Sequence, residues 1–373
     1  MKFVIEKDAL ISGLQHVMNI VGTRLTMPIL SHVLLEALEE GKITLSTTNL
    51  DIGIRCQIPA QVEQAGKITL PVKKLVPIIK SFAAKEVTFE SDNGQLVSIS
   101  CGSSHFKVLG LDVEEFPQLP RLEVEQKIEV NQMQFVRMLK SISYAQSKDE
   151  NRYLLNGVYF LLEEGKLHFI ATDGRRLALI ANEIPECLLQ REVIVPAKTI
   201  LELERTLGIG ENVRIMMTDK QIAFLIDVAD DKGVADSIYI VSKIIEGKYP
   251  NYKQVIPSAL DHRIRIDREQ LLSVIQRISL VADEKNYSVK LAFENNALEV
   301  SARSEAYGEA REIIPIAYEE ERKEIAFNPQ FLSDPLKVLT SDEVYLEFKN
   351  ELSPGVIRTN GTFLCVIMPL RLN

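Results

Sequence analysis

The chain repeats one pattern three times, and this repetition limits its fold more than any other feature. Each copy begins with a short strand and an amphipathic helix, over residues 3–22, 128–145 and 264–282. Apolar residues recur at i, i+4 and i+7, which places three side chains on one helical face. These residues are Leu10, Leu14 and Val17, then Phe135, Leu139 and Ile142, then Leu271, Ile275 and Ile278. The spacing predicts three similar domains rather than one large core.

A predicted hairpin follows each of these helices. Its tight turn falls at Glu40-Gly41, at Glu164-Gly165 and at Asn295-Asn296, with alternating apolar residues on both sides. Near the three helix starts stand Asp8, Asn131 and Asp267, residue types that cap free backbone N–H groups.

Each copy then repeats the strand-helix motif, over residues 66–82, 191–207 and 322–339. The apolar faces of these second helices are Leu75, Ile79 and Phe82, then Ile200, Leu203 and Leu207, then Leu332, Leu336 and Leu339. Pro71, Pro196 and Pro329 stand at the helix entrances, where a missing N–H costs little. The fold class is therefore α+β, with two β-α-β-β-β units in each repeat. Two proline-bearing connectors, at 114–122 and 247–257, indicate the domain boundaries. The predicted domains are residues 1–122, 123–256 and 257–373.

Composition excludes several classes of protein. No run approaches the ~18 apolar residues of a membrane span, and the start of the chain lacks a signal-peptide pattern. Cys56, Cys101, Cys187 and Cys365 are widely spaced, and no histidine pair has a metal-ligand spacing. We therefore expect free thiols in a reducing cytoplasm, no metal and no cofactor.

Charge is distributed unevenly along the chain. The net charge of −9 alone argues against a nucleic-acid partner. The six predicted helices (7–21, 71–82, 131–145, 196–207, 267–281 and 328–340) nevertheless hold eleven basic and six acidic residues, a sum of +5, which leaves −14 elsewhere. Helices gathered on one surface would attract phosphate there, although helix surfaces also favour Lys and Arg for other reasons.

Two other interpretations of the repeats are an enzyme and a scaffold that never touches DNA. An enzyme would start from Asp173 and His168, but their spacing on a strand pattern points them to opposite sides. No phosphate-binding loop or nucleophile motif accompanies them. The scaffold stays open at this level, because repetition alone does not specify a ligand.

Several segments, taken in order, resemble the bacterial sliding-clamp family, the beta subunits of DNA polymerase III. They are the opening MKF, GTRLTMPIL from Gly22, RYLLNGVYF from Arg152, ATDGRRLA from Ala171, GKYPNYKQVIP from Gly247 and the terminal VIMPLRLN. The resemblance covers essentially the whole chain. It implies DNA-clamp domains whose helices line a ring, with antiparallel sheets outside.

The family's properties set the remaining expectations. They are a non-catalytic homodimer that encircles double-stranded DNA without sequence preference, in the cytoplasm with the nucleoid. Its partners would be the polymerase III alpha subunit, the clamp loader, other polymerases and mismatch-repair proteins. No membrane is involved.

The resemblance also assigns residues. For DNA they are Arg24 and Tyr153, to which we add Arg152 and Lys198, although Arg152 could equally form a surface ion pair. For the dimer interface they are Phe106, Leu280 and Val281. The partner-peptide groove would be formed by Leu155, Thr172, Gly174, Arg175, Arg176, Leu177, Pro250, Val255, Val366, Met368, Pro369, Leu370 and Arg371. The sequence departs from the common family pattern at Leu154, Arg175, Gln254, Asn286, Leu370 and Asn373, and carries an acidic insert at 228–237.

Overall fold

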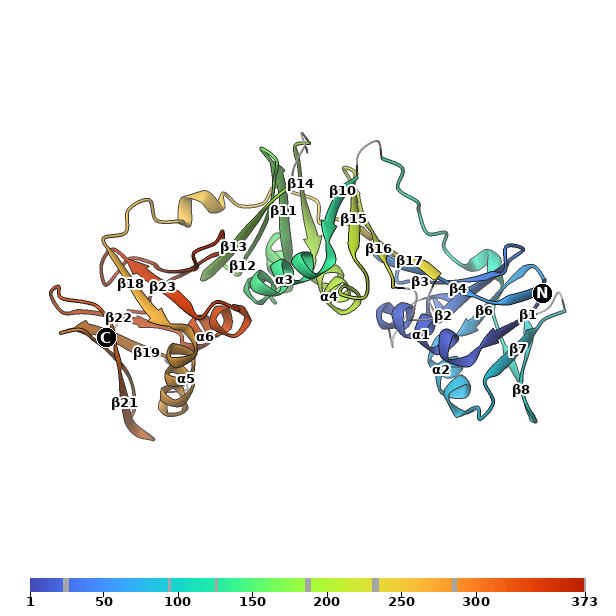
Figure 1. The fold of residues 1–373 in the computed structure, drawn as a ribbon, viewed down its shortest axis with the longest axis horizontal. Helices are drawn as coiled ribbons and strands as arrows, with labels where there is room; N and C mark the ends of the chain where they lie inside the picture. Colours follow the sequence, from blue (N-terminus) through green and yellow to red (C-terminus); the bar gives the residue numbers. More distant parts are fainter. Residues whose placement is uncertain are drawn as a thin grey trace. The chain divides into compact units, whose positions relative to one another are not determined.

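The computed structural model describes residues 1–22, 27–92, 95–124, 127–184, 189–229, 235–283 and 287–371. Each repeat follows the order β-α-β-β-β-β-α-β-β-β, with one extra strand, β5, in the first (Figure 1). The first repeat comprises β1 (Lys2–Glu6), α1 (Lys7–Val17), β2 (His32–Leu38), β3 (Lys42–Thr48), β4 (Ile52–Pro59), β5 (Gln61–Gln64), β6 (Gly66–Pro71), α2 (Val72–Ser81), β7 (Glu86–Glu90), β8 (Leu96–Cys101) and β9 (Ser104–Leu109).

The second and third repeats have the same order. The second comprises β10 (Ile128–Asn131), α3 (Gln132–Ile142), β11 (Gly157–Glu163), β12 (Lys166–Thr172), β13 (Arg176–Glu183), β14 (Arg191–Pro196), α4 (Ala197–Thr206), β15 (Asn212–Met217), β16 (Gln221–Asp227) and β17 (Ala235–Lys243). The third comprises β18 (His262–Asp267), α5 (Arg268–Ile278), β19 (Val289–Glu294), β20 (Ala297–Ser304), β21 (Gly308–Pro315), β22 (Lys323–Phe327), α6 (Pro329–Val338), β23 (Glu343–Phe348), β24 (Gly355–Arg358) and β25 (Leu364–Ile367). The predicted α+β class and its doubled β-α-β-β-β units are confirmed.

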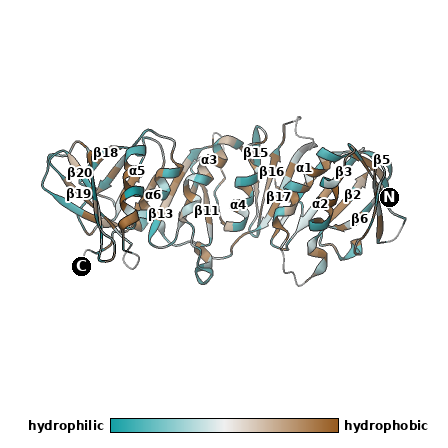
Figure 2. Cartoon of the chain, turned by 90° about the horizontal axis from the view of Figure 1, so that it is seen from below, coloured by the Kyte–Doolittle hydropathy of each residue, from teal (hydrophilic) through white to brown (hydrophobic). Residues whose placement is uncertain are grey.

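The helices are amphipathic, and Figure 2 shows hydrophobic and hydrophilic residues on each of them. The residues predicted from the i, i+4, i+7 pattern are buried in every helix except Leu339, which lies past the end of α6. The first helix of each repeat is shorter than predicted, because its last three residues form a 3-10 turn.

The hydrogen bonds at the helix N-termini only partly follow the prediction from capping residues. Asn131 and Asp267 do cap α3 and α5, accepting from the N–H groups of Gln134 and Gln270. Asp8 does not cap α1: it lies inside the first turn, where its charge favours the helix dipole. All three first helices share a tertiary bond, in which the first helical N–H donates to the carbonyl just before β7, β15 or β23, at Lys85, Glu211 and Asp342.

The three predicted hairpin turns are present, with two geometries. Glu164-Gly165 and Asn295-Asn296 form two-residue turns in which both residues have positive φ. That geometry matches the right-handed twist of paired strands. The first turn needs three residues, 39–41, and only Gly41 among them has positive φ. The prediction placed that turn correctly and underestimated its length.

Two sheets continue from one repeat into the next. β4 pairs antiparallel with β17, so one eight-stranded sheet has the order β10-β15-β16-β17-β4-β3-β2-β6. β13 pairs with β25, giving β14-β11-β12-β13-β25-β24-β23-β18. The chain accordingly divides into two compact units, residues 1–136 with 198–244, and residues 137–197 with 245–373. The boundaries 1–122, 123–256 and 257–373 stay a prediction about sequence repeats.

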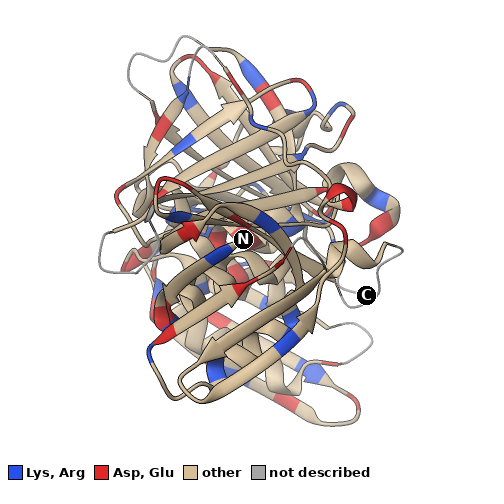
Figure 3. Cartoon of the chain, turned by 90° about the vertical axis from the view of Figure 1, so that its right-hand side faces the viewer, with Lys and Arg blue, Asp and Glu red and all other residues tan. Residues whose placement is uncertain are grey.

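Both units have apolar cores and mixed-charge surfaces. Phe3 stacks on Phe89 in the first unit, and Phe160 lies against Phe169 in the second. Lys and Arg are interspersed with Asp and Glu on the strands that face the viewer in Figure 3. One such pair is Lys2 with Glu63, at 2.8 Å.

A buried amide, which the sequence did not reveal, holds the end of α4 to the start of α3. The Gln132 side chain is fully buried. Its Nε2 donates to the carbonyls of Asn212 and Asp227 at 2.9 and 2.7 Å. Its Oε1 accepts from three consecutive N–H groups, those of residues 208–210, at 2.9 to 3.2 Å.

Replacing Gln132 with Leu should destabilise the first unit. Five part-buried backbone groups would lose their partner, and we expect the free energy of unfolding to fall by about 3–5 kcal/mol. Urea unfolding followed by circular dichroism measures this. Lys140→Ala, an exposed change in the same helix, is the control. Equal midpoints for the two variants would contradict the role given to Gln132.

Candidate functional site

A rigid turn between β12 and β13 carries several of the residues predicted for the groove. Thr172 Oγ1 donates to the carbonyl of Arg176 at 2.6 Å and accepts from the N–H of Gly174 at 3.1 Å. Asp173 Oδ1 accepts from the N–H groups of residues 175 and 176. Gly174 has φ +86°, where a side chain would be strained. The turn is therefore fixed by its own side chains.

Arg176 is committed to packing inside the second unit. Its side chain is only 9% exposed and pairs with Asp173 at 3.1 Å and with Asp334 of α6 at 2.6 Å. A third bond runs from Nη2 to the carbonyl of Tyr144 at 2.7 Å. The guanidinium also lies over the rings of Tyr144 and Phe331, 5.2 and 4.6 Å from their centroids. This residue positions the turn against α6, and little of its side-chain surface is accessible to a ligand.

An apolar floor lies beside this turn. Leu177 and Val366, directly paired across β13 and β25, are buried in one cluster with two tyrosines of the connector, Tyr249 and Tyr252. Leu155 packs against the same cluster and is partly buried. The predicted groove residues Leu155, Leu177 and Val366 are thus brought together.

The connector tyrosines were missed by the sequence analysis. Tyr249 stacks on Tyr159 of β11, with ring centroids 4.6 Å apart, and Tyr252 meets the same ring edge-on at 6.2 Å. Tyr159 in turn donates to the Glu192 carboxylate. Burial raises the pKa of both Tyr159 and Tyr249 above the usual range. The two tyrosines of GKYPNYKQVIP were the available signal, because aromatic side chains bury large apolar areas.

The C-terminal tail leaves β25 along the edge of the same site. The N–H of Met368 donates to the carbonyl of Arg175 at 3.0 Å, and the N–H of Leu370 donates to Ala326 of β22 at 2.8 Å. Met368 and Leu370 expose about two fifths of their surface, at 43% and 38%. The tail is held by its backbone, which leaves two apolar side chains on the surface.

The other predicted groove residues lie on the surface around this floor. Pro250, Gln254, Val255, Arg175 and Arg371 are exposed, and Pro369 is partly exposed. Leu154 is partly buried against the apolar cluster. Asn373 and Asn286 lie outside the described residues, as does most of the 228–237 insert.

The residues predicted for DNA come from separate segments of the chain. Arg152 and Tyr153 are exposed on a 3-10 segment, where Arg152 donates to the carbonyl of Asp173 at 2.9 Å. Lys198 is exposed at the start of α4, in the other compact unit. Arg24 lies outside the described residues.

The helical basic residues divide into committed and free groups. Arg277 pairs with Glu312, Arg205 with the buried Glu202, and Arg268 donates to the carbonyls of Ser341 and Leu336. In the described part of the chain, five exposed basic residues of the helices have neither an ionic partner nor a side-chain hydrogen bond: Lys74, Lys80, Arg137, Lys140 and Lys198. Lys73 is exposed too, and its Nζ donates to the carbonyl of Gly22 at 2.9 Å. Ion pairs therefore neutralise part of the net positive charge expected of the helices. The five side chains without contacts hold the positive charge that is still available to a ligand.

The residues predicted for a dimer interface lie on or beside two of the edge strands, β9 and β21. Phe106 is on β9, the edge strand of the five-stranded sheet, and is 37% exposed with its ring edge against Phe82. Leu280, 82% exposed, and Val281 lie in the 3-10 turn after α5. That turn packs against β21, the edge strand of the four-stranded sheet.

Asp173, the carboxylate from which an enzyme hypothesis would start, is engaged by the fold. Both carboxylate oxygens of Asp173 are used by the turn amides and by Arg176. The described residues contain no cluster of His, Cys, Asp or Glu able to hold a metal ion. Cys56, Cys101 and Cys365 are free and buried, and burial raises the pKa of Cys56 and Cys365 to about 12. Cys187 lies outside the described residues.

Among the described residues, no helix has both the length and the apolar character needed to cross a membrane.

Comparison with known proteins agrees with the repeats and the continuous sheets. Models of the N-terminal, central and C-terminal domains of the DNA polymerase III beta subunit match residues 1–120, 129–251 and 253–371. The beta sliding clamps of Synechococcus elongatus and Caulobacter vibrioides are each 32% identical over the full length of both chains.

Solved structures show the same likeness. The DNA polymerase sliding clamp from Bacillus subtilis has a TM-score of 0.93 at 30% identity, and the DNA polymerase III subunit beta from Pseudomonas aeruginosa has 0.92 at 29%. Both comparisons cover 100% of each chain. Three repeated α+β domains joined by continuous antiparallel sheets define the DNA-clamp class of fold. This chain belongs to the DNA polymerase III beta subunit family, the beta sliding clamps.

Replacing Arg176 with Lys should destabilise the second unit. A single ammonium cannot reach Asp173, Asp334 and the Tyr144 carbonyl together, and it cannot stack as a planar group does. We expect the free energy of unfolding to drop by about 2–4 kcal/mol. Urea titration with tyrosine fluorescence is the measurement. The exposed neighbour change Arg175→Lys should leave the midpoint in place, and a similar drop in both would show that Arg176 is not the structural centre.

Proposed function

We propose that this chain is a sliding clamp that works as a closed ring of two copies around duplex DNA. One observation carries the proposal. In both internal junctions, the last strand of a repeat's first half pairs with the last strand of the next repeat: β4 with β17, and β13 with β25. The unpaired equivalents are β21 and β9, each at the edge of its sheet.

Pairing β21 of one copy with β9 of another would repeat the internal junction. It would give a sheet ordered β22-β19-β20-β21-β9-β8-β7-β1-β5, which matches the order of the two eight-stranded sheets strand for strand apart from the extra strand β5. Two copies have two such edges each, so the pairing can close on itself and leave no β9 or β21 edge open. Exposed edges of this length otherwise invite aggregation.

The free helical cations supply the contact with DNA. Five exposed basic side chains with no ionic or hydrogen-bond partner can meet phosphates and read no bases, so binding would be weak and indifferent to sequence. Weak contacts suit sliding, because retention comes from the closed ring. Arg24, Arg152 and Tyr153 are proposed as further DNA contacts.

The apolar floor of Leu155, Leu177 and Val366, rimmed by Arg175, Met368 and Leu370, is proposed as the groove for partner peptides. An apolar pocket with polar edges suits an extended peptide with aliphatic or aromatic anchors. The partners proposed are the polymerase III alpha subunit, the clamp loader, other polymerases and mismatch-repair proteins. The chain would act without catalysis, as a tether in the cytoplasm with the nucleoid.

Topology gives the decisive experiment. After loading, the protein should stay on a nicked circular DNA through gel filtration and leave once the circle is cut to a linear form. Retention on both forms, or on neither, would contradict encirclement and favour a scaffold that does not surround DNA.

Phe106→Asp should separate the copies. A charge placed on the β9 edge would be buried if β9 and β21 pair, so we expect the dimer dissociation constant to rise about a hundredfold or more. Sedimentation velocity measures the monomer fraction. Leu352→Asp, at an exposed turn between β23 and β24, is the control and should stay dimeric. An unchanged dimer in the Phe106 variant would place the interface elsewhere.

Removing helical cations should weaken direct DNA binding and its salt dependence together. For the triple change Lys74→Ala, Lys140→Ala and Lys198→Ala, the slope of log K against log salt should shrink by about 0.9 for each lost phosphate contact. Fluorescence anisotropy with linear duplexes measures the slope. Lys253→Ala serves as the control, because Lys253 pairs with Glu163 on the connector side. Equal slopes for both would remove these helices from the DNA surface.

A further inference from the structure

The junction between the first and second repeats reproduces the turn of the candidate groove. Thr48 Oγ1 donates to the carbonyl of Ile52 at 3.0 Å and accepts from the N–H of Leu50 at 3.0 Å. Asn49 Oδ1 accepts from the N–H groups of residues 51 and 52. These are the same bonds, at the same relative positions, as those of Thr172 and Asp173 in the turn between β12 and β13.

The strands beside the turn are in the same register. Gly53 pairs with Val241 as Leu177 pairs with Val366. The N–H of Lys243 donates to the carbonyl of Asp51 at 2.9 Å, as the N–H of Met368 donates to Arg175 at 3.0 Å. A proline-bearing connector crosses each junction, with Pro117 here and Pro250 there. The first junction is thus a structural repeat of the candidate groove.

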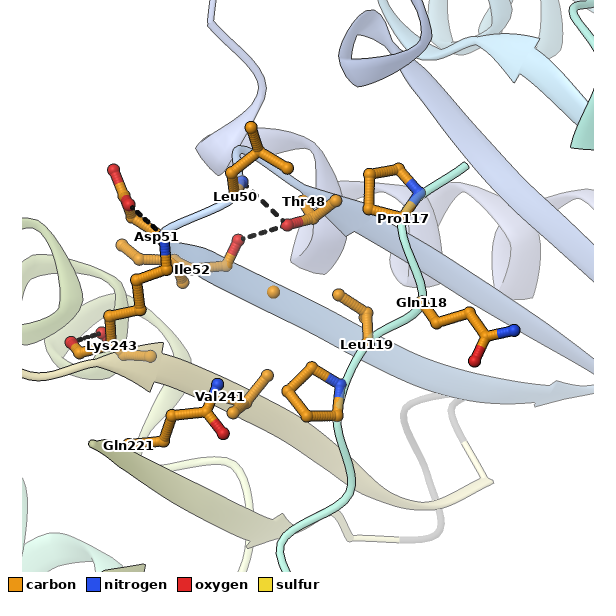
Figure 4. Close-up of a pocket in the computed structure, with 13 residues that line it drawn as sticks. Thr48, Leu50, Asp51, Ile52, Pro117, Gln118, Leu119, Gln221, Val241 and Lys243 are labelled. Carbon is orange, nitrogen blue, oxygen red and sulfur yellow. Dashed lines mark hydrogen bonds and ion pairs between the residues drawn. The ribbon is translucent and has the colours of Figure 1, made fainter. Parts of the chain in front are cut away.

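A pocket of about 110 Å³ lies at this first junction (Figure 4). Ile52, Val241 and the connector residue Leu119 form much of its apolar lining. The connector runs along one side, and the paired strands lie across from it. Gly53 leaves room for the Leu119 side chain, because a Cβ at residue 53 would lie 2.3 Å from Leu119 Cδ2. The volume suits one aliphatic side chain and is too small for a nucleotide or a drug-sized molecule.

Leu50, at the mouth of this pocket, has features that folding alone does not explain. It has φ +76°, a left-handed conformation that strains a branched side chain, and it is 45% exposed. The equivalent residue in the candidate groove is Gly174, which adopts this conformation freely. A strained backbone that holds an apolar side chain at a pocket mouth is typical of a binding site.

The connector also offers unused backbone groups next to the pocket. Among the described residues, the N–H groups of Gln118 and Leu119 have no hydrogen-bond partner. Tyr239 anchors the segment by donating to the carbonyl of Pro120 at 3.1 Å and accepting from the N–H of Leu122 at 3.0 Å. An extended peptide could bond to such a fixed, open backbone while inserting a side chain beside it.

We propose that the first junction is a second peptide-binding site, which takes one Leu- or Ile-sized side chain of an extended peptide between Leu50, Ile52, Leu119 and Val241. Its rim is the Asp51–Lys243 ion pair, at 3.2 Å, where the candidate groove has Arg175 and Met368. The two sites would therefore select different residues beside the anchor. The proposal rests in part on the peptide-binding role proposed for that groove.

Methyl-resolved NMR of the full chain tests the proposal directly. The probe is the blocked pentapeptide acetyl-Ser-Ser-Leu-Ser-Ser-amide, titrated to millimolar concentration, with Ala in place of Leu as its control. The methyl resonances of Leu50, Ile52, Leu119 and Val241 should shift with the Leu peptide and stay unmoved with the Ala peptide. Absence of these shifts, or equal shifts with both peptides, would overturn the proposal.

A matched pair of variants separates binding from folding. Leu50→Asn keeps a residue that tolerates positive φ and removes the apolar wall, so affinity at this pocket should fall about tenfold. Leu352→Asn, another exposed leucine far along the chain, should leave it unchanged. Unaltered affinity in the Leu50 variant would also refute the site.

The same titration reports on the candidate groove through Leu177 and Val366. Shifts there without shifts at the first junction would refute the second site and support the groove. Shifts at the first junction alone would support the second site and count against the proposed groove.

Discussion

Strand edges govern the architecture of this chain. Each repeat builds sheets whose outer strands present unpaired N–H and C=O groups, and such groups require partners. β4 with β17 and β13 with β25 meet that requirement inside the chain. The two compact units consequently combine strands from neighbouring repeats, which is why residues 123–256, a single domain by sequence, contribute to both. Backbone pairing rather than side-chain identity joins the repeats.

Buried polar groups supply what uniform apolar packing cannot. Gln132 gathers five backbone groups around the end of α4, and Arg176 connects a turn, a helix and two aromatic rings. Each is fully engaged, as the low dielectric of a protein interior demands. These polar contacts determine the orientation in which the elements pack. The apolar residues drive the packing without specifying that orientation.

The sequence predicted those features that depend on local periodicity. Helix faces such as Leu10, Leu14 and Val17, and turns such as Glu164-Gly165, follow from spacing alone, and the structure confirms them. The exact helix ends did not follow, because a 3-10 turn and a helix end have similar apolar patterns. The role of Gln132 could not be predicted for another reason. Glutamine is usually a surface residue, and only the tertiary structure shows that this one is buried.

The candidate site was predictable to a similar extent. Leu155, Leu177 and Val366 do meet in one apolar cluster, but the resemblance to a family, rather than spacing, had brought them together. Arg176 had been grouped with them as a groove residue, which stays a prediction, and the contacts of its guanidinium with Asp173, Asp334 and aromatic rings were not foreseen. The tyrosines at 249 and 252 depend on how the connector folds back over β11, which no local pattern encodes.

The connectors at 114–122 and 247–257 have a mechanical consequence. They tether the strands of both internal junctions, so after a local rupture the strands remain at high effective concentration and re-pair quickly. A pairing of β21 with β9 between copies would use the same backbone bonds without any tether. Under strain, a ring of this kind would separate at its two subunit boundaries while its internal joints hold, and so could open as a gate without unfolding.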